Sequence, residues 1–200
     1  KPFSEACERN KAPILECLQP LYAPLRHVFE VGSGTGQHAL HFAAAMPHLI
    51  WQCSETPAQM DVLQRGLAGH GLPNLPPPVS FAAGQPWPAE PAEAVFTANT
   101  LHIMGWDEVQ MLFAGLAGWL PAQGLLSVYG PFNYGGRFTS DSNARFDASL
   151  RAADPRRGLR DFEAVDALAQ TGGLQLLEDR AMPANNRCLT WRRGVAEALR

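Results

Sequence analysis

The sequence has few cysteines and no excess of basic residues. Its 200 residues include four cysteines, Cys7, Cys17, Cys53 and Cys188, and none belongs to a Cys-x-x-Cys pair. A chain of this length can build a core without disulfides, so we expect reduced thiols and a cytoplasmic protein. The net charge is −3. We therefore expect no nucleic-acid partner, because binding through phosphate neutralisation requires a basic surface.

Long apolar runs are also missing. No segment approaches the roughly 18–20 apolar residues that span a bilayer, so we expect no membrane partner. The start, KPFSEACERNK, lacks the apolar core of a signal peptide, and because it begins at Lys1 rather than Met it leaves the natural N-terminus open. His38 and His41 are three residues apart on a predicted helix, but no third ligand is near in sequence, so we expect no metal.

Hydrophobic residues make up 46% of the chain and charged residues 18%, which is typical of a soluble globular domain. The pattern of apolar runs and helical spacing predicts strands at 27–31, 49–55, 79–83, 93–99, 124–132, 174–182 and 187–193, and helices at about 4–19, 35–46, 56–68, 106–120, 140–152 and 161–172. This alternation predicts an α/β, Rossmann-like, seven-stranded and mostly parallel sheet. Helices would cover both faces, and the last two strands would form an antiparallel hairpin.

The order of elements also predicts the domain organisation. A helix precedes the first strand, and the connection after strand 124–132 is unusually long. We expect one domain over residues 1–193, with an N-terminal helical cap at 1–25, a lid insertion at 133–160 and a tail at 194–200.

The stretch EVGSGTG at residues 30–36 lies between a predicted strand and a predicted helix. Glycines there permit a tight turn and let a ligand approach bare backbone at a helix N-terminus. A dinucleotide site would have its last glycine at position 37, which is Gln37, and Glu30 would repel a pyrophosphate. A carboxylate at Glu30 would instead attract a nucleoside with cationic groups. S-adenosylmethionine, with its ammonium and sulfonium, fits that description.

Glu55 ends the second predicted strand, 25 residues after Glu30. An acidic side chain at this position can accept hydrogen bonds from both ribose hydroxyls. Because nicotinamide dinucleotides use the same device, Glu55 alone does not discriminate between ligands. A solvated residue at the end of a strand is the alternative interpretation.

At this point the chain resembles class I S-adenosylmethionine-dependent methyltransferases, closest to a family that includes methyltransferase-like protein 26. The resemblance rests on EVGSGTGQHALHFA (30–43), NTLHIMGW (99–106), SNARFDASLRAADPRRGLRDFEAV (142–165) and shorter stretches such as ERNKAPIL, QPWP, YGPF and MPANN. It implies S-adenosylmethionine as cofactor, with cofactor-binding positions at Glu30, Gly32, Ser33, Gly34, Gly36, Glu55 and Asn99. In that family an Asp that binds the adenine amino group usually follows the third strand. Ala82 stands there instead, so we expect adenine to be held by backbone groups and by apolar contact with Trp87.

The loop after the fourth predicted strand contains the candidate catalytic residues. In this architecture ligands bind outside the carboxyl ends of the strands, so Asn99 and His102 would face the donor methyl group. His102 is the candidate general base, because an imidazole titrates near neutrality, and Asn99 would orient the donor or the acceptor. A histidine packed under the lid is the alternative. A catalytic His102 should open onto a cavity under residues 134–160 and the N-terminal helix, with ring nitrogens not both occupied by protein groups.

Two further groups are candidates for contact with ligands. In the resembling enzymes a helix before the first strand covers the cofactor pocket, which suggests three residues for the donor carboxylate or an acidic acceptor: Arg9, Asn10 and Lys11. A solvated helix face explains them equally well. The fifth predicted strand and the loop after it offer candidate acceptor contacts at Tyr129, Tyr134 and Arg137, with a structural loop network as the alternative.

The sequence thus predicts an S-adenosylmethionine-dependent methyltransferase that acts on an unidentified small-molecule acceptor. A non-catalytic S-adenosylmethionine-binding sensor or interaction protein is the alternative. A nicotinamide-dependent oxidoreductase is disfavoured by Gln37 and Glu30. The sequence leaves the acceptor and the oligomeric state open.

Overall fold

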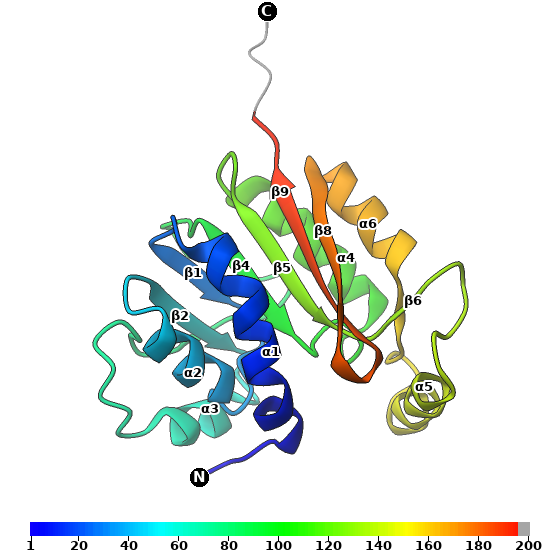
Figure 1. Ribbon diagram of the computed structural model, residues 1–200, viewed down its shortest axis with the longest axis horizontal. Helices are drawn as coiled ribbons and strands as arrows, with labels where there is room; N and C mark the ends of the chain where they lie inside the picture. The colour runs from blue at the N-terminus through cyan, green and yellow to red at the C-terminus, as the bar shows by residue number, and fades with distance from the viewer. Residues whose placement is uncertain (196–200) are drawn as a thin grey trace, which may run out of the picture.

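The fold is organised around one seven-stranded sheet, seen in a computed structural model that describes residues 1–195 (Figure 1). The strands follow the order β3 (Val79–Ser80), β2 (Ile50–Glu55), β1 (His27–Glu30), β4 (Ala94–Ala98), β5 (Leu125–Gly130), β9 (Asn186–Arg193), β8 (Leu174–Met182). The first five are mutually parallel, and β9 is antiparallel to both of its neighbours. The predicted fold class, including the C-terminal hairpin, is confirmed. Of the predicted tail, residues 196–200 lie outside the described residues.

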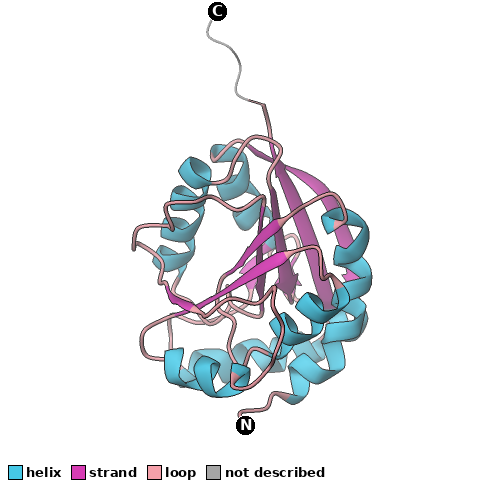
Figure 2. Cartoon of the chain, turned by 90° about the vertical axis from the view of Figure 1, so that its left-hand side faces the viewer, coloured by secondary structure: helices cyan, strands magenta, loops and turns pink. Residues whose placement is uncertain are grey.

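Helices cover both faces of this sheet (Figure 2). On one face lie α1 (Glu5–Tyr22), α2 (Gln37–Ala45) and α3 (Met60–Leu67), and on the other lie α4 (Trp106–Trp119) and α6 (Phe162–Thr171). A further helix, α5 (Asp141–Ala153), lies beyond the end of the sheet. Within residues 1–195, no helix has the length and apolar character that crossing a membrane requires.

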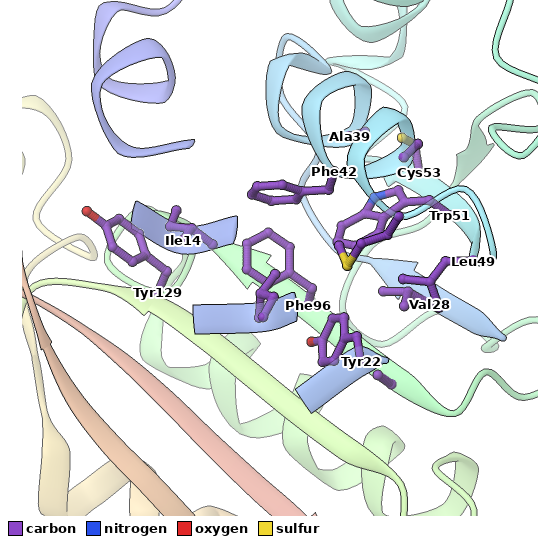
Figure 3. Packing of buried hydrophobic residues seen from close by; sticks show 14 of the residues in the cluster. Ile14, Tyr22, Val28, Ala39, Phe42, Leu49, Trp51, Cys53, Phe96 and Tyr129 are labelled. Carbon is purple, nitrogen blue, oxygen red and sulfur yellow. The ribbon is translucent and has the colours of Figure 1, made fainter. Parts of the chain in front are cut away.

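The alternation of side chains along the strands builds two separate cores. In β1, Val28 joins the cluster under α1, α2 and α3, whereas Phe29 joins the cluster under α4 and α6. Phe42, Trp51 and Phe96 pack together in the first cluster, with ring centroids 5.3 to 5.6 Å apart (Figure 3). Because each large apolar side chain contributes roughly 1.5–3 kcal/mol when buried, these two clusters fix the register of the strands.

Three elements differ from the predicted ones. The predicted helix at 56–68 begins only at Met60, because the backbone N–H of Thr56 donates to the Glu55 carboxylate (2.8 Å) and residues 56–59 form a turn. The strand predicted at 79–83 is reduced to two residues at the sheet edge. α1 continues to Tyr22 even though it contains Pro13 and Pro20.

A small parallel pairing was not anticipated. After β5 the chain forms β6 (Phe132–Asn133), which pairs with β7 (Arg160–Asp161). This pairing closes the long segment that contains α5. Figure 1 shows α5 and the start of α1 at the same end of the sheet, where the parallel strands have their carboxyl ends. Loops 31–36 and 99–105 follow β1 and β4 at this end, which is the usual place for ligands in such sheets.

Candidate functional site

The glycine turn after β1 packs tightly against its neighbours at two of its three glycines and is open at the third. Gly32, Gly34 and Gly36 all have positive φ, at +70°, +57° and +81°. A Cβ on Gly32 would lie 2.8 Å from Oγ1 of Thr100, and one on Gly36 would lie 2.6 Å from a methyl carbon of Leu67. A Cβ on Gly34 would meet no protein atom within 4 Å. The turn therefore needs glycine for packing at two positions, whereas at Gly34 it exposes bare backbone to open space.

Residues on β2 and α3 hold this turn in place. The Ser33 backbone N–H donates to the Ser54 carbonyl (2.9 Å), and the Ser33 hydroxyl accepts the Ser54 N–H (3.2 Å). A Cβ on Gly66 of α3 would lie only 1.8 Å from the Thr35 carbonyl oxygen. Sequence reasoning missed Gly66, although a glycine inside a helix is a signal for close packing. The structure therefore gives Ser33 a structural role at the β2 contact.

Glu55 links the end of β2 directly to Gly34. Its Oε2 accepts the Gly34 N–H at 2.9 Å, and its Oε1 accepts the Thr56 N–H at 2.8 Å. The side chain is buried, yet each carboxylate oxygen has a second lone pair that can accept another hydrogen bond. Glu55, the residue predicted to bind the ribose, is thus oriented by the N–H of Gly34, which lies beside open space.

Glu30 lies deeper than expected. It is 1% exposed, and its Oε1 accepts the indole N–H of Trp51 (3.2 Å) and faces the Cys53 thiol (3.9 Å). Burial raises the pKa of the Glu30 carboxyl to about 7, although the hydrogen bond from Trp51 opposes this shift. The carboxylate is therefore not permanently ionised at neutral pH. A cation bound nearby would favour its ionised form, and direct contact with such a ligand stays a prediction.

The region expected to hold adenine differs from the prediction at Trp87. Its indole packs in the core cluster under α4, with ring centroids 4.6 Å from Phe81 and 4.9 Å from Trp119. These partners, which the sequence pattern did not pair with it, account for its position. At Ala82 the backbone N–H donates to Oε1 of Gln85 (2.9 Å). An apolar contact between Trp87 and adenine is thus less favoured than the sequence suggested.

Two polar side chains converge where β4 and β5 end. Asn99 has φ +54°, a left-handed conformation that Asn tolerates better than most residues, and its N–H donates to the Tyr129 carbonyl (2.9 Å). A Cβ on Gly130 would lie 3.7 Å from Asn99 Oδ1 and 3.8 Å from His102 Nδ1. The structure thus brings the two predicted catalytic residues together beside the bare backbone of Gly130.

His102 is buried under α5. Its ring meets Phe146 edge-on at 5.4 Å between centroids, and its carbonyl accepts the Gly158 N–H (3.1 Å). No residue among 1–195 hydrogen-bonds to the ring nitrogens, and each nitrogen keeps a small accessible surface. The residue as a whole is only 5% exposed. This is the arrangement expected for a base, although burial also fits a histidine packed under the lid.

The titration of His102 differs from the expectation. Burial, reinforced by the positive charge of Arg160, lowers the pKa of His102 to about 4. The ring is therefore neutral at pH 7 and can accept a proton, but it is a weaker base than an imidazole in water. The sequence suggested titration near neutrality because burial by α5, far along the chain, could not be foreseen.

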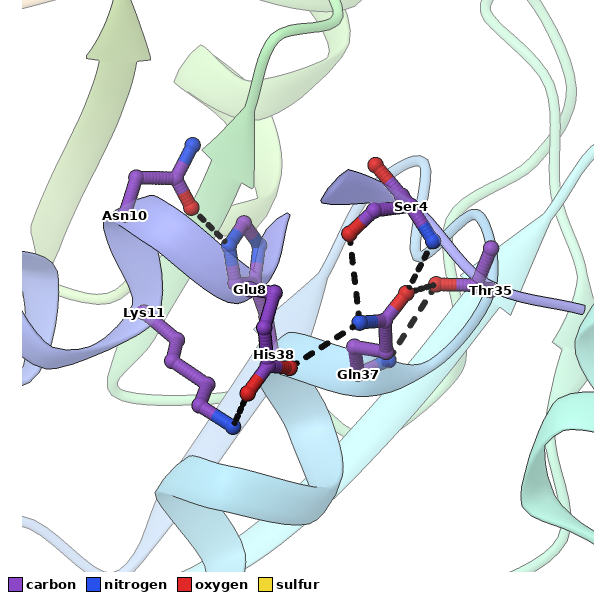
Figure 4. A network of polar contacts seen from close by, with 7 residues as sticks. All are labelled: Ser4, Glu8, Asn10, Lys11, Thr35, Gln37 and His38. Carbon is purple, nitrogen blue, oxygen red and sulfur yellow. Dashed lines mark hydrogen bonds and ion pairs between the residues drawn. The ribbon is translucent and has the colours of Figure 1, made fainter. Parts of the chain in front are cut away.

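α1 is attached to the glycine turn and to α2 by a polar network (Figure 4). The Ser4 backbone N–H donates to Oε1 of Gln37 (2.5 Å), and the Gln37 amide donates back to the Ser4 carbonyl (3.3 Å). Oδ1 of Asn10 lies 2.6 Å from Nε2 of His38. The side-chain oxygen of Asn10, a predicted ligand contact, is thus already bound to His38. Among residues 1–195 no three His, Cys, Asp or Glu side chains are arranged to hold a metal.

The two charged candidates on α1 differ from each other. Lys11 forms an ion pair with Glu8 at 2.5 Å, within the same helix. Arg9 is exposed, and no carboxylate among residues 1–195 pairs with it. Lys11 is therefore paired within α1 in this structure. Contact of Arg9 with a ligand stays a prediction.

The tyrosines in and after β5 belong to structural networks. The Tyr134 hydroxyl donates to Oδ2 of Asp179 (2.8 Å), and its ring stacks on Phe162 at 5.2 Å. Tyr129 is buried in the cluster under α1 (Figure 3). Arg137 is exposed and pairs through its backbone with Tyr134. The β8–β9 hairpin thus takes the hydrogen bond that the Tyr134 hydroxyl donates, and contact of these three residues with an acceptor stays a prediction.

Buried groups with shifted pKa values make stability depend on pH. Burial lowers the pKa of His38 and His102 from 6.5 to about 4, so the unfolded chain binds more protons and stability falls as the pH falls through this range. Glu30 acts in the opposite sense, because its pKa is raised from 4.5 to about 7 and the folded state binds its proton more tightly. Between pH 7 and pH 5 each of the three groups changes the free energy of unfolding by about 2 kcal/mol.

A His102→Gln variant separates these contributions. Between pH 7 and pH 5 the wild-type protein should lose about 2 kcal/mol more stability than the variant, because only the wild type carries the low-pKa imidazole of His102. This difference does not depend on the other groups that titrate in the same range, such as His41, whose pKa burial also lowers. Urea denaturation at the two pH values measures both differences. An unchanged pH dependence in the variant would mean that His102 protonates freely in the folded protein.

Solved structures of methyltransferases have the same fold. An O-methyltransferase family protein from Burkholderia thailandensis superimposes with a TM-score of 0.83 at 18% identity, over 96% of this chain and 59% of that one. Human N-acetylserotonin methyltransferase, solved in complex with SAM, gives a TM-score of 0.76 at 15% identity, over 96% of this chain and 53% of that one. An O-methyltransferase family 2 protein from Planctomyces limnophilus, in complex with apigenin, gives 0.73 at 13% identity, over 92% and 61%.

These matches establish the class I methyltransferase fold and no more, because the identities are low. The chain spans little more than half the length of each of these proteins. At the level of sequence, one family model matches residues 1–193. Because this match covers nearly the whole chain, the protein belongs to the family described as "Protein of unknown function (DUF938)".

Proposed function

We propose that this protein is an S-adenosylmethionine-dependent methyltransferase that acts on a small-molecule acceptor. The observation that supports this most strongly is the open side of the turn at Gly34, whose N–H is held by Glu55. Class I methyltransferase folds, one of them solved with SAM, provide the structural context. We also propose that the protein is akin to the family of methyltransferase-like protein 26 and that it is located in the cytoplasm. Its chain would form a single domain with a helical cap and a lid.

The residues around the turn fit S-adenosylmethionine in chemistry. No protein atom lies within 4 Å of the position that a Cβ on Gly34 would take, which leaves room for a ligand beside the backbone. Glu55 retains lone pairs for ribose hydroxyls, and the half-titrated Glu30 can ionise when a cation is near. Ala82 offers no side-chain acceptor for an adenine amino group, so backbone carbonyls must take that role. The cofactor, when bound, supplies an electrophilic methyl group on a sulfonium.

His102 and Asn99 would act on the acceptor. Transfer would join the acceptor oxygen or nitrogen to the methyl carbon that the bound cofactor supplies, and the electron pair of the broken carbon–sulfur bond would stay on sulfur. The acceptor would lose its proton to a ring nitrogen of His102, which is neutral at pH 7. Asn99 is held in a left-handed conformation beside Gly130 and can orient the acceptor by a hydrogen bond.

Two observations favour a second candidate, a protein that binds S-adenosylmethionine without methyl transfer. The lowered pKa of His102 makes it a weak base, and Ala82 removes one expected contact with the cofactor. Such a protein would act as a sensor or as an interaction partner. It would bind S-adenosylmethionine and S-adenosylhomocysteine with similar geometry but would need no acceptor.

Transfer of a labelled methyl group tests the proposal. Purified protein is incubated with methyl-labelled S-adenosylmethionine and a fractionated small-molecule extract, with excess S-adenosylhomocysteine as a competing control. We expect protein-dependent label in a low-molecular-weight fraction that the competitor suppresses. Absence of label in every fraction, together with normal binding of S-adenosylmethionine, would contradict the enzyme and favour the sensor.

A further inference from the structure

The turn that carries His102 receives its hydrogen bonds from the segment after α5. The Arg160 guanidinium donates to the carbonyls of Leu101 (3.0 Å) and Met104. Between these two, the His102 carbonyl accepts the Gly158 N–H at 3.1 Å. Carbonyls at the end of a helical turn need partners from outside the turn. A distant part of the sequence thus supplies the hydrogen bonds to three carbonyls of this one turn.

Arg160 is itself fixed from several sides. Its guanidinium also donates to the Arg156 carbonyl at 3.0 Å and lies over the Trp106 ring, 5.8 Å from the centroid. Its backbone pairs with Phe132 in the β6–β7 ladder. Because a guanidinium presents its donors in a fixed plane, a lysine cannot reproduce this set of contacts. Arg160 therefore connects the start of α4 and β6 to the turn of His102.

The other end of the same turn packs on the glycine turn. A Cβ on Gly32 would lie 2.8 Å from Oγ1 of Thr100. The Met104 N–H donates to the Thr100 carbonyl at 3.1 Å, which closes the turn. The place of His102 between the two ends thus depends on packing at Thr100 and on the hydrogen bonds from Arg160.

We infer that Arg160 is a positioning residue, whose hydrogen bonds to the turn keep the His102 ring beside Phe146, in the place from which it would accept the proton of the methyl acceptor. Arg160 acts through His102 and does not itself contact the acceptor. The role of His102 in transfer rests on the proposed function, but the place of its ring can be measured without transfer.

The charge of Arg160 also acts on the ring. Burial and, to a smaller extent, the positive charge of Arg160 lower the pKa of His102 to about 4. On α5, Asp147 and Arg151 form an ion pair at 2.8 Å and shift the pKa of Arg160 in opposite directions. Phe146, which packs on the ring, is uncharged. Removal of the Arg160 charge should therefore raise the pKa of His102, whereas a lysine in its place should not.

Nuclear magnetic resonance of the histidine ring protons tests the inference without an acceptor. In the wild type we expect a nuclear Overhauser effect between the rings of His102 and Phe146, whose centroids are 5.4 Å apart. Arg160→Lys keeps the charge but not the planar donors, so this effect should weaken while the pKa of His102 stays low. Arg160→Gln removes both, so the effect should weaken and the pKa should also rise by roughly 1.

Arg156→Gln is the matched control. Its side chain is exposed and pairs with Asp154 at 3.2 Å, so this variant removes the same charge without touching the carbonyls of the turn. It should leave the ring contact and the pKa of His102 unchanged. The indole N–H signal of Trp51, in the cluster under α1, α2 and α3, reports whether each variant stays folded.

The ring contact decides the outcome. An unchanged contact between the rings of His102 and Phe146 in folded Arg160→Lys and Arg160→Gln would overturn the inference. Should Arg160→Gln unfold, the ring contact in the more conservative Arg160→Lys decides alone.

Rates of transfer test whether Arg160 acts through His102. With the labelled donor at saturation, Arg160→Lys should slow transfer by roughly 10–100-fold and leave the affinity for S-adenosylhomocysteine unchanged. In a His102→Gln background the same change should have little further effect, because the residue through which it acts is gone. Equal losses in the two backgrounds would overturn the inference. If the wild type transfers no methyl group while the ring contact responds as expected, the proposed function fails and the positioning of the ring by Arg160 stands.

Discussion

Replacing Gly34 with Asn is expected to abolish binding of S-adenosylmethionine while the protein stays folded. Gly34 has φ +57°, a conformation that Asn adopts more readily than other residues with a Cβ, and no protein atom lies within 4 Å of the added Cβ. The new side chain would therefore occupy ligand space rather than protein space. We expect affinity to fall by at least ~100-fold, equivalent to about 2.7 kcal/mol, measured by calorimetry.

Gly69 provides a matched control for this variant. It also has a positive φ, +71°, and open space around an added Cβ, but it lies in the loop after α3. Gly69→Asn therefore imposes the same backbone requirement away from the glycine turn. It should leave the affinity for S-adenosylmethionine unchanged. Equal affinities in the two variants would place the ligand somewhere other than at the turn.

Replacing His102 with Gln is expected to slow methyl transfer by roughly 10²–10⁴-fold, the usual contribution of a general base. Glutamine keeps polar atoms in the space of the ring but cannot accept the proton. The affinity for S-adenosylmethionine should change little, since the glycine turn and Glu55 provide the contacts proposed for the nucleoside. Initial rates with the labelled donor and the acceptor fraction, together with calorimetry, measure the two effects separately.

The pH dependence of the wild-type rate gives an independent check. Because burial lowers the pKa of His102 to about 4, its neutral form predominates above pH 5. With saturating S-adenosylmethionine, so that ionisation of Glu30 does not limit the rate through cofactor binding, a rate limited by this base should be flat from about pH 5.5 upward and should fall below pH 5. Under these conditions a rate that rises through pH 6–7 would point to a different base or to an ordinary imidazole. An unchanged rate in His102→Gln would remove the catalytic role.

The order of strands and helices followed from the sequence because local patterns determine it. The β-branched run HVFEV and the glycines after it specify β1 and the turn. The short turn PANN between the last two strands specifies the antiparallel hairpin, because it leaves no room for a crossover helix, and it forms a single 3-10 turn at Pro183–Asn185. Positions fixed by the backbone, such as Gly34 and Glu55, also lie together as expected. These features depend on neighbours in sequence or on the edge of a parallel sheet.

Side-chain partners that lie far apart in sequence could not be predicted in the same way. Trp87 packs under α4, the Tyr134 hydroxyl is occupied by Asp179, and Asn10 contacts His38. Each partner comes from an element whose exact placement the hydrophobic pattern does not give. The low pKa of His102 has the same origin. Phe146 covers the ring and Arg160 places a positive charge near it, and both come from the segment around α5, far along the chain.

Binding of the sulfur nucleoside is the central claim, and calorimetry with S-adenosylhomocysteine and NAD tests it most directly. S-adenosylhomocysteine is preferred to the donor because it cannot be consumed during the titration. We predict one binding site per chain for S-adenosylhomocysteine, loss of that site in Gly34→Asn, and no measurable heat with NAD under the same conditions. Comparable affinity for NAD, or no binding of S-adenosylhomocysteine by the wild-type protein, would contradict the assignment of this site.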